Sequence, residues 1–357
     1  MTQSSGAGGA NAGLPSRRRV LGAALRLGAS AAIAATGLTA LSGCTPSDPR
    51  VAGSNGPTPS PTPTPTRPTV APAPPPQTFA AELALADLAA AILAGPHRGQ
   101  LSSGQRTLLT AAAQGHRQHA AALASPAPTA RPTAPVPSSR PAAPSDITRL
   151  SLPQSLALLR RQELAQRDRA RDTALSRSGF ESLVWGSISV AAASWATALS
   201  TKAAVPVAAA GPSRPMAAQS DVEALQSMVR QLHALVYGYQ LALGRLSPTS
   251  AAGRRASQSL LARRSLRNDL VDALIARSAS VPAAAGAYAP PVDPSSPARA
   301  AELIRRMETA FQPFCGLWLA AASRPGDRSR AYDVLADTTA TALSWRAPVT
   351  AWPGWVT

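Results

Sequence analysis

Apolar residues recur at alternating spacings of three and four positions through most of the chain after Thr78. This period places them on one face of an α-helix. The clearest seam consists of Val222, Leu225, Val229, Leu232, Val236, Tyr239, Leu243 and Leu246. No stretch shows the alternation of β-branched residues that indicates a strand, so the sequence predicts an all-α fold.

The periodic segments predict eight helices in two groups of four. The first group covers residues 78–94, 103–124, 150–177 and 180–200, and the second covers 219–246, 250–279, 297–323 and 328–346. Connections are mostly short, which favours antiparallel neighbours. We therefore expect two antiparallel four-helix bundles in tandem, over residues 78–201 and 219–357, although eight helices also fit one larger bundle. A Pro-rich loop (125–145) and a linker (202–218) interrupt the helices.

Residues 1–43 have the three parts of an export signal. Arg17 and Arg18, followed by Leu21, form a basic start of the twin-arginine type, which bacterial export receptors read. An Ala/Gly/Leu-rich stretch then ends at Leu41. Arg26 interrupts this stretch, which suits a cleaved signal better than a permanent membrane span.

The signal closes with Leu41-Ser42-Gly43-Cys44, which resembles the bacterial lipobox. The resemblance implies cleavage after Gly43 and attachment of diacylglycerol to Cys44. An ordinary secretory signal with an incidental cysteine is the alternative. A lipid-modified Cys44 would make the bilayer a partner and would place the protein at the outer face of the cytoplasmic membrane.

Residues 44–77 are rich in Pro and Thr and carry no apolar pattern. Such segments favour extended polyproline II, at about 3.1 Å per residue. We expect a disordered tether between the lipid anchor and the helices.

The chain carries a formal net charge of +17, and Lys202 is its only lysine. The arginines suit anionic headgroups or an anionic wall polymer, although a GC-rich genome would give the same composition passively. They are dispersed and no nucleic-acid-binding motif appears, so we exclude nucleic acid as a partner. After Cys44 the one remaining cysteine is Cys315, so packing rather than a disulfide must stabilise the helices.

Two motifs in the second group of helices are informative. They are His233-Ala234-Leu235-Val236-Tyr237-Gly238-Tyr239 and Trp345-Arg346-Ala347-Pro348-Val349-Thr350-Ala351-Trp352-Pro353-Gly354. Together they resemble a ferritin-like domain of unknown function common in actinobacterial lipoproteins, over residues 219–357. The resemblance implies a ferritin-like bundle, and that family has no agreed activity to transfer. We expect Trp352 to Trp355 to fold back and cap the bundle, with a partner anchor as the alternative.

Ferritin-like dimetal sites use a Glu from each of two helices and a Glu-x-x-His from each of the other two. The second group lacks this set, because Leu232 and Arg264 stand where the family pattern leads us to expect an acidic residue and a histidine. Glu308 remains as a single carboxylate. We expect Arg264 and Glu308 to form a buried ion pair there, the alternative being a solvent-facing Arg264.

In the first group, Glu82, His116, His119 and Glu163 lie on apolar stripes of three different helices. The stripes aim them at one interior, and imidazole with carboxylate suits iron, zinc or copper. The fourth helix offers no Glu-x-x-His. A hydrogen-bonded polar layer without metal is therefore the simpler expectation, and a metal or haem site is the alternative.

The sequence thus predicts a non-enzymatic, membrane-anchored envelope lipoprotein, with no catalytic residue and no cofactor. Its degenerate ferritin-like module would bind or scaffold an envelope protein or an anionic wall polymer. The alternative is an exported metal- or haem-binding protein that uses the His/Glu site for iron or another transition metal.

Overall fold

A computed structural model of the protein describes residues 76–124, 147–201, 204–209 and 213–356. The predicted export signal, Cys44 and the Pro-rich loop lie outside these residues. Regular structure in the described part is helical apart from two isolated bridges. The all-α prediction is therefore confirmed.

All eight predicted helices are present, and their ends differ from the predicted ends by at most four residues. They are α2 (Pro76–Ala94), α3 (Ser103–Ala124), α4 (Leu152–Ser176), α5 (Gly179–Ser200), α6 (Asp221–Leu243), α7 (Ala251–Ile275), α8 (Pro297–Ala321) and α9 (Pro325–Ser344). Short 3₁₀ turns occupy Arg98–Gln100 and Ile147–Arg149.

Local sequence explains several helix starts. Ser220 caps α6, because its side chain accepts from the Glu223 N–H while Glu223 accepts from the Ser220 N–H. This reciprocal arrangement pairs donors that a helix start leaves free. Helices α8 and α9 each have a proline in the first turn, where the missing N–H costs nothing.

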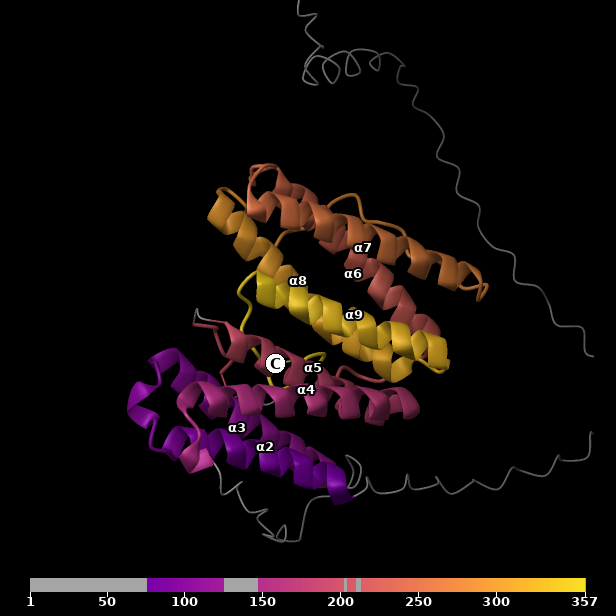
Figure 1. Cartoon of the computed structure of the whole chain (residues 1–357). Helices are drawn as coiled ribbons and strands as arrows, with labels where there is room; N and C mark the ends of the chain where they lie inside the picture. The colour runs from indigo at the N-terminus through magenta and orange to yellow at the C-terminus, as the bar shows by residue number, and fades with distance from the viewer. Residues whose placement is uncertain (1–75, 125–146, 202–203, 210–212, 357) are drawn as a thin grey trace, which may run out of the picture. The chain divides into compact units, whose positions relative to one another are not determined.

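The helices pack in two sets, α2–α5 and α6–α9 (Figure 1). In the first set α2 packs on α3 and α4, and α4 packs on α5; in the second, α6 packs on α7 and α8, and α8 packs on α9. The sets share a face, since α5 contacts both α8 and α9. All of these helices belong to one compact unit.

Helix α5 lies at the centre of this arrangement. By length and composition α5 alone among the described helices could cross a membrane, and most of it is buried inside the protein. Core burial therefore accounts for its apolar sequence. At Gly186 the helix approaches α8 so closely that an added Cβ would lie 2.4 Å from Leu319 Cδ2.

Residues 347–356, the C-terminal tail, fold back from α9 onto the first set of helices. Val349 N–H donates to Pro206 O at 2.9 Å, and Ala208 N–H donates to Val349 O at 2.9 Å. Val356 and Arg214 exchange a second pair of backbone bonds. The tail also lies against α3 and α5, which are distant from it in the sequence.

Candidate metal centre

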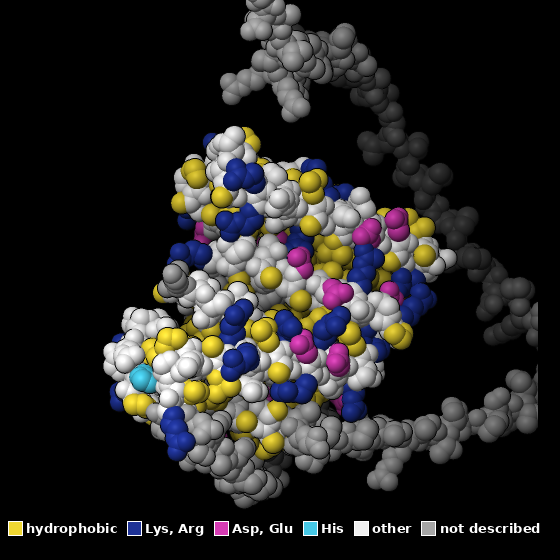
Figure 2. Space-filling model, viewed as in Figure 1, with side chains coloured by type: hydrophobic (Ala, Val, Ile, Leu, Met, Phe, Trp, Pro, Cys, Tyr) yellow, Lys and Arg dark blue, Asp and Glu magenta, His cyan; other side chains and the backbone are white. Residues whose placement is uncertain are grey.

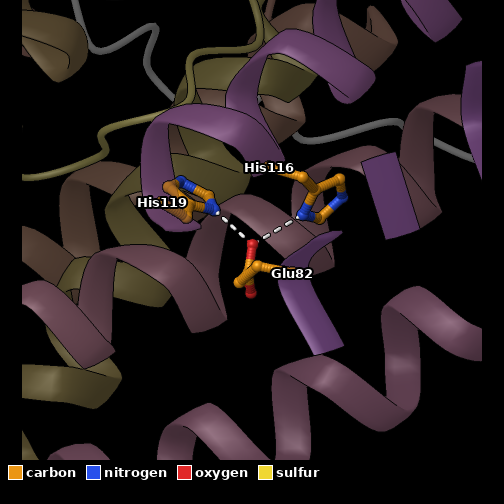
Figure 3. Close-up of side chains that lie close together, drawn as sticks. All are labelled: Glu82, His116 and His119. Atoms are coloured by element: carbon orange, nitrogen blue, oxygen red, sulfur yellow. Dashed lines mark hydrogen bonds and ion pairs between the residues drawn. The ribbon is translucent and has the colours of Figure 1, made fainter. Parts of the chain in front are cut away.

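Glu82 of α2, His116 and His119 of α3, and Glu163 of α4 converge in the interior of the first set. All four are fully buried, at 0% exposure. Figure 3 shows Glu82 between the two imidazole rings. The residues reach one point because each occupies the buried stripe of its own helix.

Both imidazoles turn the same nitrogen towards the same oxygen. His116 Nδ1 lies 2.8 Å from Glu82 Oε2, and His119 Nδ1 lies 2.9 Å from that atom. The rings are nearly perpendicular, with centroids 5.8 Å apart. Three ligand-type atoms thus surround one small space.

The other nitrogen of each ring, Nε2, faces an oxygen atom on the side away from Glu82. His116 Nε2 lies 2.8 Å from Glu163 Oε1, and His119 Nε2–H donates to Ala351 O at 2.7 Å. A carbonyl oxygen can only accept, so His119 carries its proton on Nε2. Metal-bound histidines are held in the same way, by a carboxylate or carbonyl on the nitrogen away from the ion.

Three further groups complete the cluster: the Gln166 amide, the Ala351 carbonyl and the Trp352 ring. Gln166 Nε2 donates to Glu82 Oε1 at 2.5 Å, and Gln166 Oε1 accepts from Arg169. Trp352 of the tail lies edge-on to His119, with ring centroids 4.8 Å apart. Gln166 belongs to the predicted stripe of α4, whereas the Ala351 carbonyl and Trp352 come from residues that no local pattern links to α3.

The cluster favours charge despite its burial. Burial alone would lower the pKa of His116, but the carboxylates of Glu163 and Glu82 outweigh it and raise that pKa to about 10. Burial would raise the pKa of Glu82, but His116 and His119 beside it hold that pKa well below its usual value. In this arrangement positive charge on His116 offsets the carboxylates beside it.

One polar atom of the cluster lacks a partner. Glu163 Oε2 is buried and makes no hydrogen bond. A buried, unpartnered carboxylate oxygen costs free energy, and such an atom often marks a position for water or an ion. Among the described residues, Glu82, His116 and His119 form the one group of this kind that could hold a metal, with ligand atoms within 4.8 Å of one another.

A second buried polar cluster lies in the other set of helices. Arg263 of α7 donates to both oxygens of Glu308 on α8, at 3.0 and 2.8 Å, and also to Asp337 Oδ2 at 2.9 Å. Tyr239 donates to Glu308 Oε1 at 2.6 Å. These donors occupy the single carboxylate, and no metal is needed to balance it.

The predicted partner of Glu308 was wrong by one position. Arg263, 2% exposed, makes the ion pair, while Arg264 is only partly buried. The buried stripe of α7 runs through Ala256, Leu260, Arg263 and Leu266. This stripe turns Arg264 away from Glu308.

The remaining chemically interesting side chains have structural contacts. His97 and His233 pair with the carbonyl oxygens of Leu150 and Pro282. Cys315 is fully buried, and burial raises the pKa of its thiol to about 12, which makes it unreactive. Neither histidine lies with the cluster.

A half-open pocket, here called the cavity, of about 60 Å³ lies beside the cluster, with the C-terminal tail as one of its walls. Its walls include Gly115 and Gln118 of α3, Trp195 of α5, and Ala351 and Trp352 of the tail. The indole N–H of Trp195 is buried without a partner. A space of this size holds a few waters.

The face of the described residues seen in Figure 2 shows no comparable concentration of chemistry. Arg side chains are scattered over it and alternate there with acidic and apolar ones. This face therefore presents no single basic patch for an anionic polymer.

Comparison with known proteins gives a family for part of the chain. Residues 224–357 match the sequence model of a family described as "Domain of unknown function (DUF4439)". The chain is also similar to a conserved hypothetical protein from Mycobacterium tuberculosis with a crystal structure, at 30% identity over 35% of this chain and 93% of that one, with a TM-score of 0.34. No curated protein matches the chain. The chain thus carries a DUF4439 domain over α6–α9 and the tail, whereas the His/Glu ligands lie on helices before it.

Proposed function

We propose that the protein is a membrane-anchored envelope lipoprotein that binds one divalent transition-metal ion at Glu82, His116 and His119, within helices α2–α5. The observation that carries the proposal is the shared orientation of the two rings. Both Nδ1 atoms face Glu82 Oε2, while both Nε2 atoms are held by oxygen acceptors behind them.

The positions of the ring protons leave a place for a cation. With Nε2 protonated on each ring, a neutral histidine has a lone pair on Nδ1. Two such lone pairs would face a carboxylate oxygen at 2.8 and 2.9 Å. Only a cation between them relieves that repulsion, and it is either a pair of protons or a metal ion.

The ligand geometry suits a metal with a small adjustment. Metal–nitrogen and metal–oxygen bonds of about 2.0–2.1 Å place two donors of a tetrahedral site about 3.3 Å apart. The present N···O separations of 2.8 and 2.9 Å would widen by a few tenths of an ångström, and the two Nδ1 atoms, which lie within 4.8 Å of each other, would have to adopt the same spacing. Imidazole and carboxylate donors without thiolate suit zinc, iron or copper.

The burial of the site favours holding an ion rather than catalysis. The three ligands have no exposed surface, and the adjacent cavity of about 60 Å³ is far too small for haem. A bound metal would supply charge and fix the packing of α2, α3 and α4. We therefore propose a metal-holding role and no enzymatic one.

The second candidate function is a metal-free scaffold, with α6–α9 as a degenerate ferritin-like module that binds an envelope protein. The present hydrogen-bond distances favour it, because a proton on each Nδ1 would satisfy Glu82 without a metal. The pairing of Glu308 with Arg263 supports it, because the buried carboxylate of Glu308 is already balanced by an arginine.

Metal analysis separates the two candidates. The full chain is purified from membranes of its native host and from cells grown with added zinc, iron or copper. We expect one metal ion per chain, and background levels after His116→Gln or His119→Gln. The matched controls are His97→Gln and His233→Gln, which change the other two of the four histidines. Metal-free protein with an intact helical spectrum under every condition would overturn metal binding and support the scaffold.

A further inference from the structure

The C-terminal tail contacts the histidine cluster from outside the helices that carry it. Ala351 O accepts from His119 Nε2 at 2.7 Å, and the Trp352 ring lies edge-on to the same imidazole. Trp352 Nε1 also donates to Gln118 Oε1 at 3.1 Å, one residue before His119. The tail thus fixes both the ring orientation and the neighbouring turn of α3.

The tail is also the non-helical cover of the site in the described structure. Glu82, His116 and His119 have no exposed surface, so an ion reaches them only if something moves. Separating α2, α3 or α4 would open the apolar core around them. The tail instead lines, together with residues 207–209 and Ser213 of the connecting segment, a half-open pocket of about 60 Å³ beside α3.

The tail is joined to the rest of the protein without any helix of its own. Backbone bonds join it to the connecting segment at Val349 and Val356, and Ser187 donates to Pro353 O at 2.7 Å and accepts from Trp355 Nε1 at 2.8 Å. Val349 and Trp352 are also buried. Lifting the tail would break these contacts but no hydrogen bond within a helix, and such local opening costs less free energy than separating core helices.

We infer that the C-terminal tail positions the metal ligand His119 through Ala351 O and Trp352, and that it is the cover whose release lets the ion enter and leave. This inference rests on the proposed metal binding. It makes the DUF4439 domain a part of a site whose ligands lie outside that domain.

A disulfide that can be formed and then reduced tests whether the tail must move for the ion to leave. A Cβ built at Gly115 lies 3.2 Å from Ala351 Cβ, close to the Cβ separation of about 3.8 Å in a disulfide. The full chain with Gly115→Cys and Ala351→Cys is loaded with Zn²⁺ and then oxidised. Release of Zn²⁺ to a chromogenic chelator is followed before and after reduction with a phosphine.

We expect oxidation to slow Zn²⁺ release at least tenfold and reduction to restore the parent rate. The same oxidising treatment should leave each single-cysteine variant unchanged. Equal release rates in the oxidised and reduced double variant would overturn the inference, since the ion would then leave by another route. In that outcome stoichiometric zinc binding would still support the proposed function, whereas absence of zinc binding in the parent would sink both.

A second pair of variants tests positioning. Trp352→Phe and Trp355→Phe each remove one indole N–H bond from the tail, but Trp352 alone contacts His119. NMR of protein labelled with ¹⁵N-histidine follows the ring nitrogens of the four histidines of the chain. We expect Trp352→Phe to shift the His119 nitrogens and to weaken Zn²⁺ binding several-fold, and Trp355→Phe to leave the His119 signals in place. Equal effects of the two variants would contradict a positioning role.

Discussion

Gly316 of α8 and Gly354 of the tail pack backbone against backbone. A Cβ added at Gly316 would lie 2.1 Å from Gly354 O and 2.9 Å from Gly354 Cα. Gly354 itself has φ +87°, a conformation that favours glycine. The pair holds the tail against α8 of the second set, three residues after Ala351 has reached His119 in the first set.

Gly316→Ala should therefore destabilise the protein. The added methyl meets backbone atoms that cannot rotate away, so we expect a loss of about 1–3 kcal/mol in the free energy of unfolding. Gly326→Ala in α9 is the matched control, because nothing lies within 4 Å of its added Cβ. That control should be neutral or slightly stabilising. Urea unfolding measures both, and equal effects would show that the tail is not seated as described.

Stability should depend on pH through the histidine cluster. The pKa of His116 is raised from 6.5 to about 10, so its contribution is complete below pH 6.5 and is lost as the pH rises towards 10. The loss approaches about 1.4 kcal/mol per pH unit for one proton. The lowered pKa of Glu82 acts in the opposite sense, since its contribution is present above 4.5 and is lost as the pH falls further.

The measurement is urea unfolding between pH 5 and pH 10 in the presence of a chelator. The parent should be most stable near pH 5–6.5, and His116→Gln should flatten the decline on the alkaline side. A decline that survives unchanged in His116→Gln would assign it to other groups. Bound metal should reverse the trend, because binding releases protons and strengthens with rising pH.

The two adjacent arginines of α7 should respond differently to substitution. Arg263→Leu leaves the buried Glu308 with Tyr239 as its remaining side-chain donor, and breaking a buried ion pair costs about 3–5 kcal/mol. Arg264→Leu should change stability by less than about 0.5 kcal/mol. Thermal unfolding compares them. Replacing both Arg263 and Glu308 by Leu should recover much of the loss, and a double variant as unstable as Arg263→Leu would argue against an uncompensated charge.

The two cysteines provide a test of the proposed anchor. Cys44→Ser should move the protein from the membrane fraction to the soluble extracytoplasmic fraction, because no acyl chain can be attached. Cys315→Ser should stay with the membrane, since that thiol is buried in the helical core. Fractionation and blotting measure both. A Cys44→Ser protein that still sediments with membranes would rule out lipid anchoring at this residue.

Apolar periodicity predicted the helices and the stripes on which Glu82, His116, His119 and Glu163 lie, because both depend on local sequence. It did not distinguish Arg263 from Arg264. Each stands three or four residues after Leu260, and the choice between them depends on the rotation of α7 against α8. That rotation is set by packing between helices rather than by either residue.

The acceptor of His119 lay beyond any sequence argument. Ala351 contributes a backbone carbonyl, which every residue has, and it lies 232 positions from the histidine. Only the path of the tail across the first set brings the two together. The export signal and the lipobox in residues 1–44 are the opposite case. They are recognised from the sequence alone, and they stay a prediction.

The close contact of α5 with α8 and α9 has a consequence for dividing the chain. A fragment beginning at residue 224, where the family match starts, would lack Gly186, against which Leu319 packs. It would also lack the α3 and α5 residues that bond Trp352 and Trp355. Such a fragment would expose apolar surface along two helices and leave two indole rings in water. The boundaries of the DUF4439 domain and the boundaries of the folding unit therefore do not coincide in this protein.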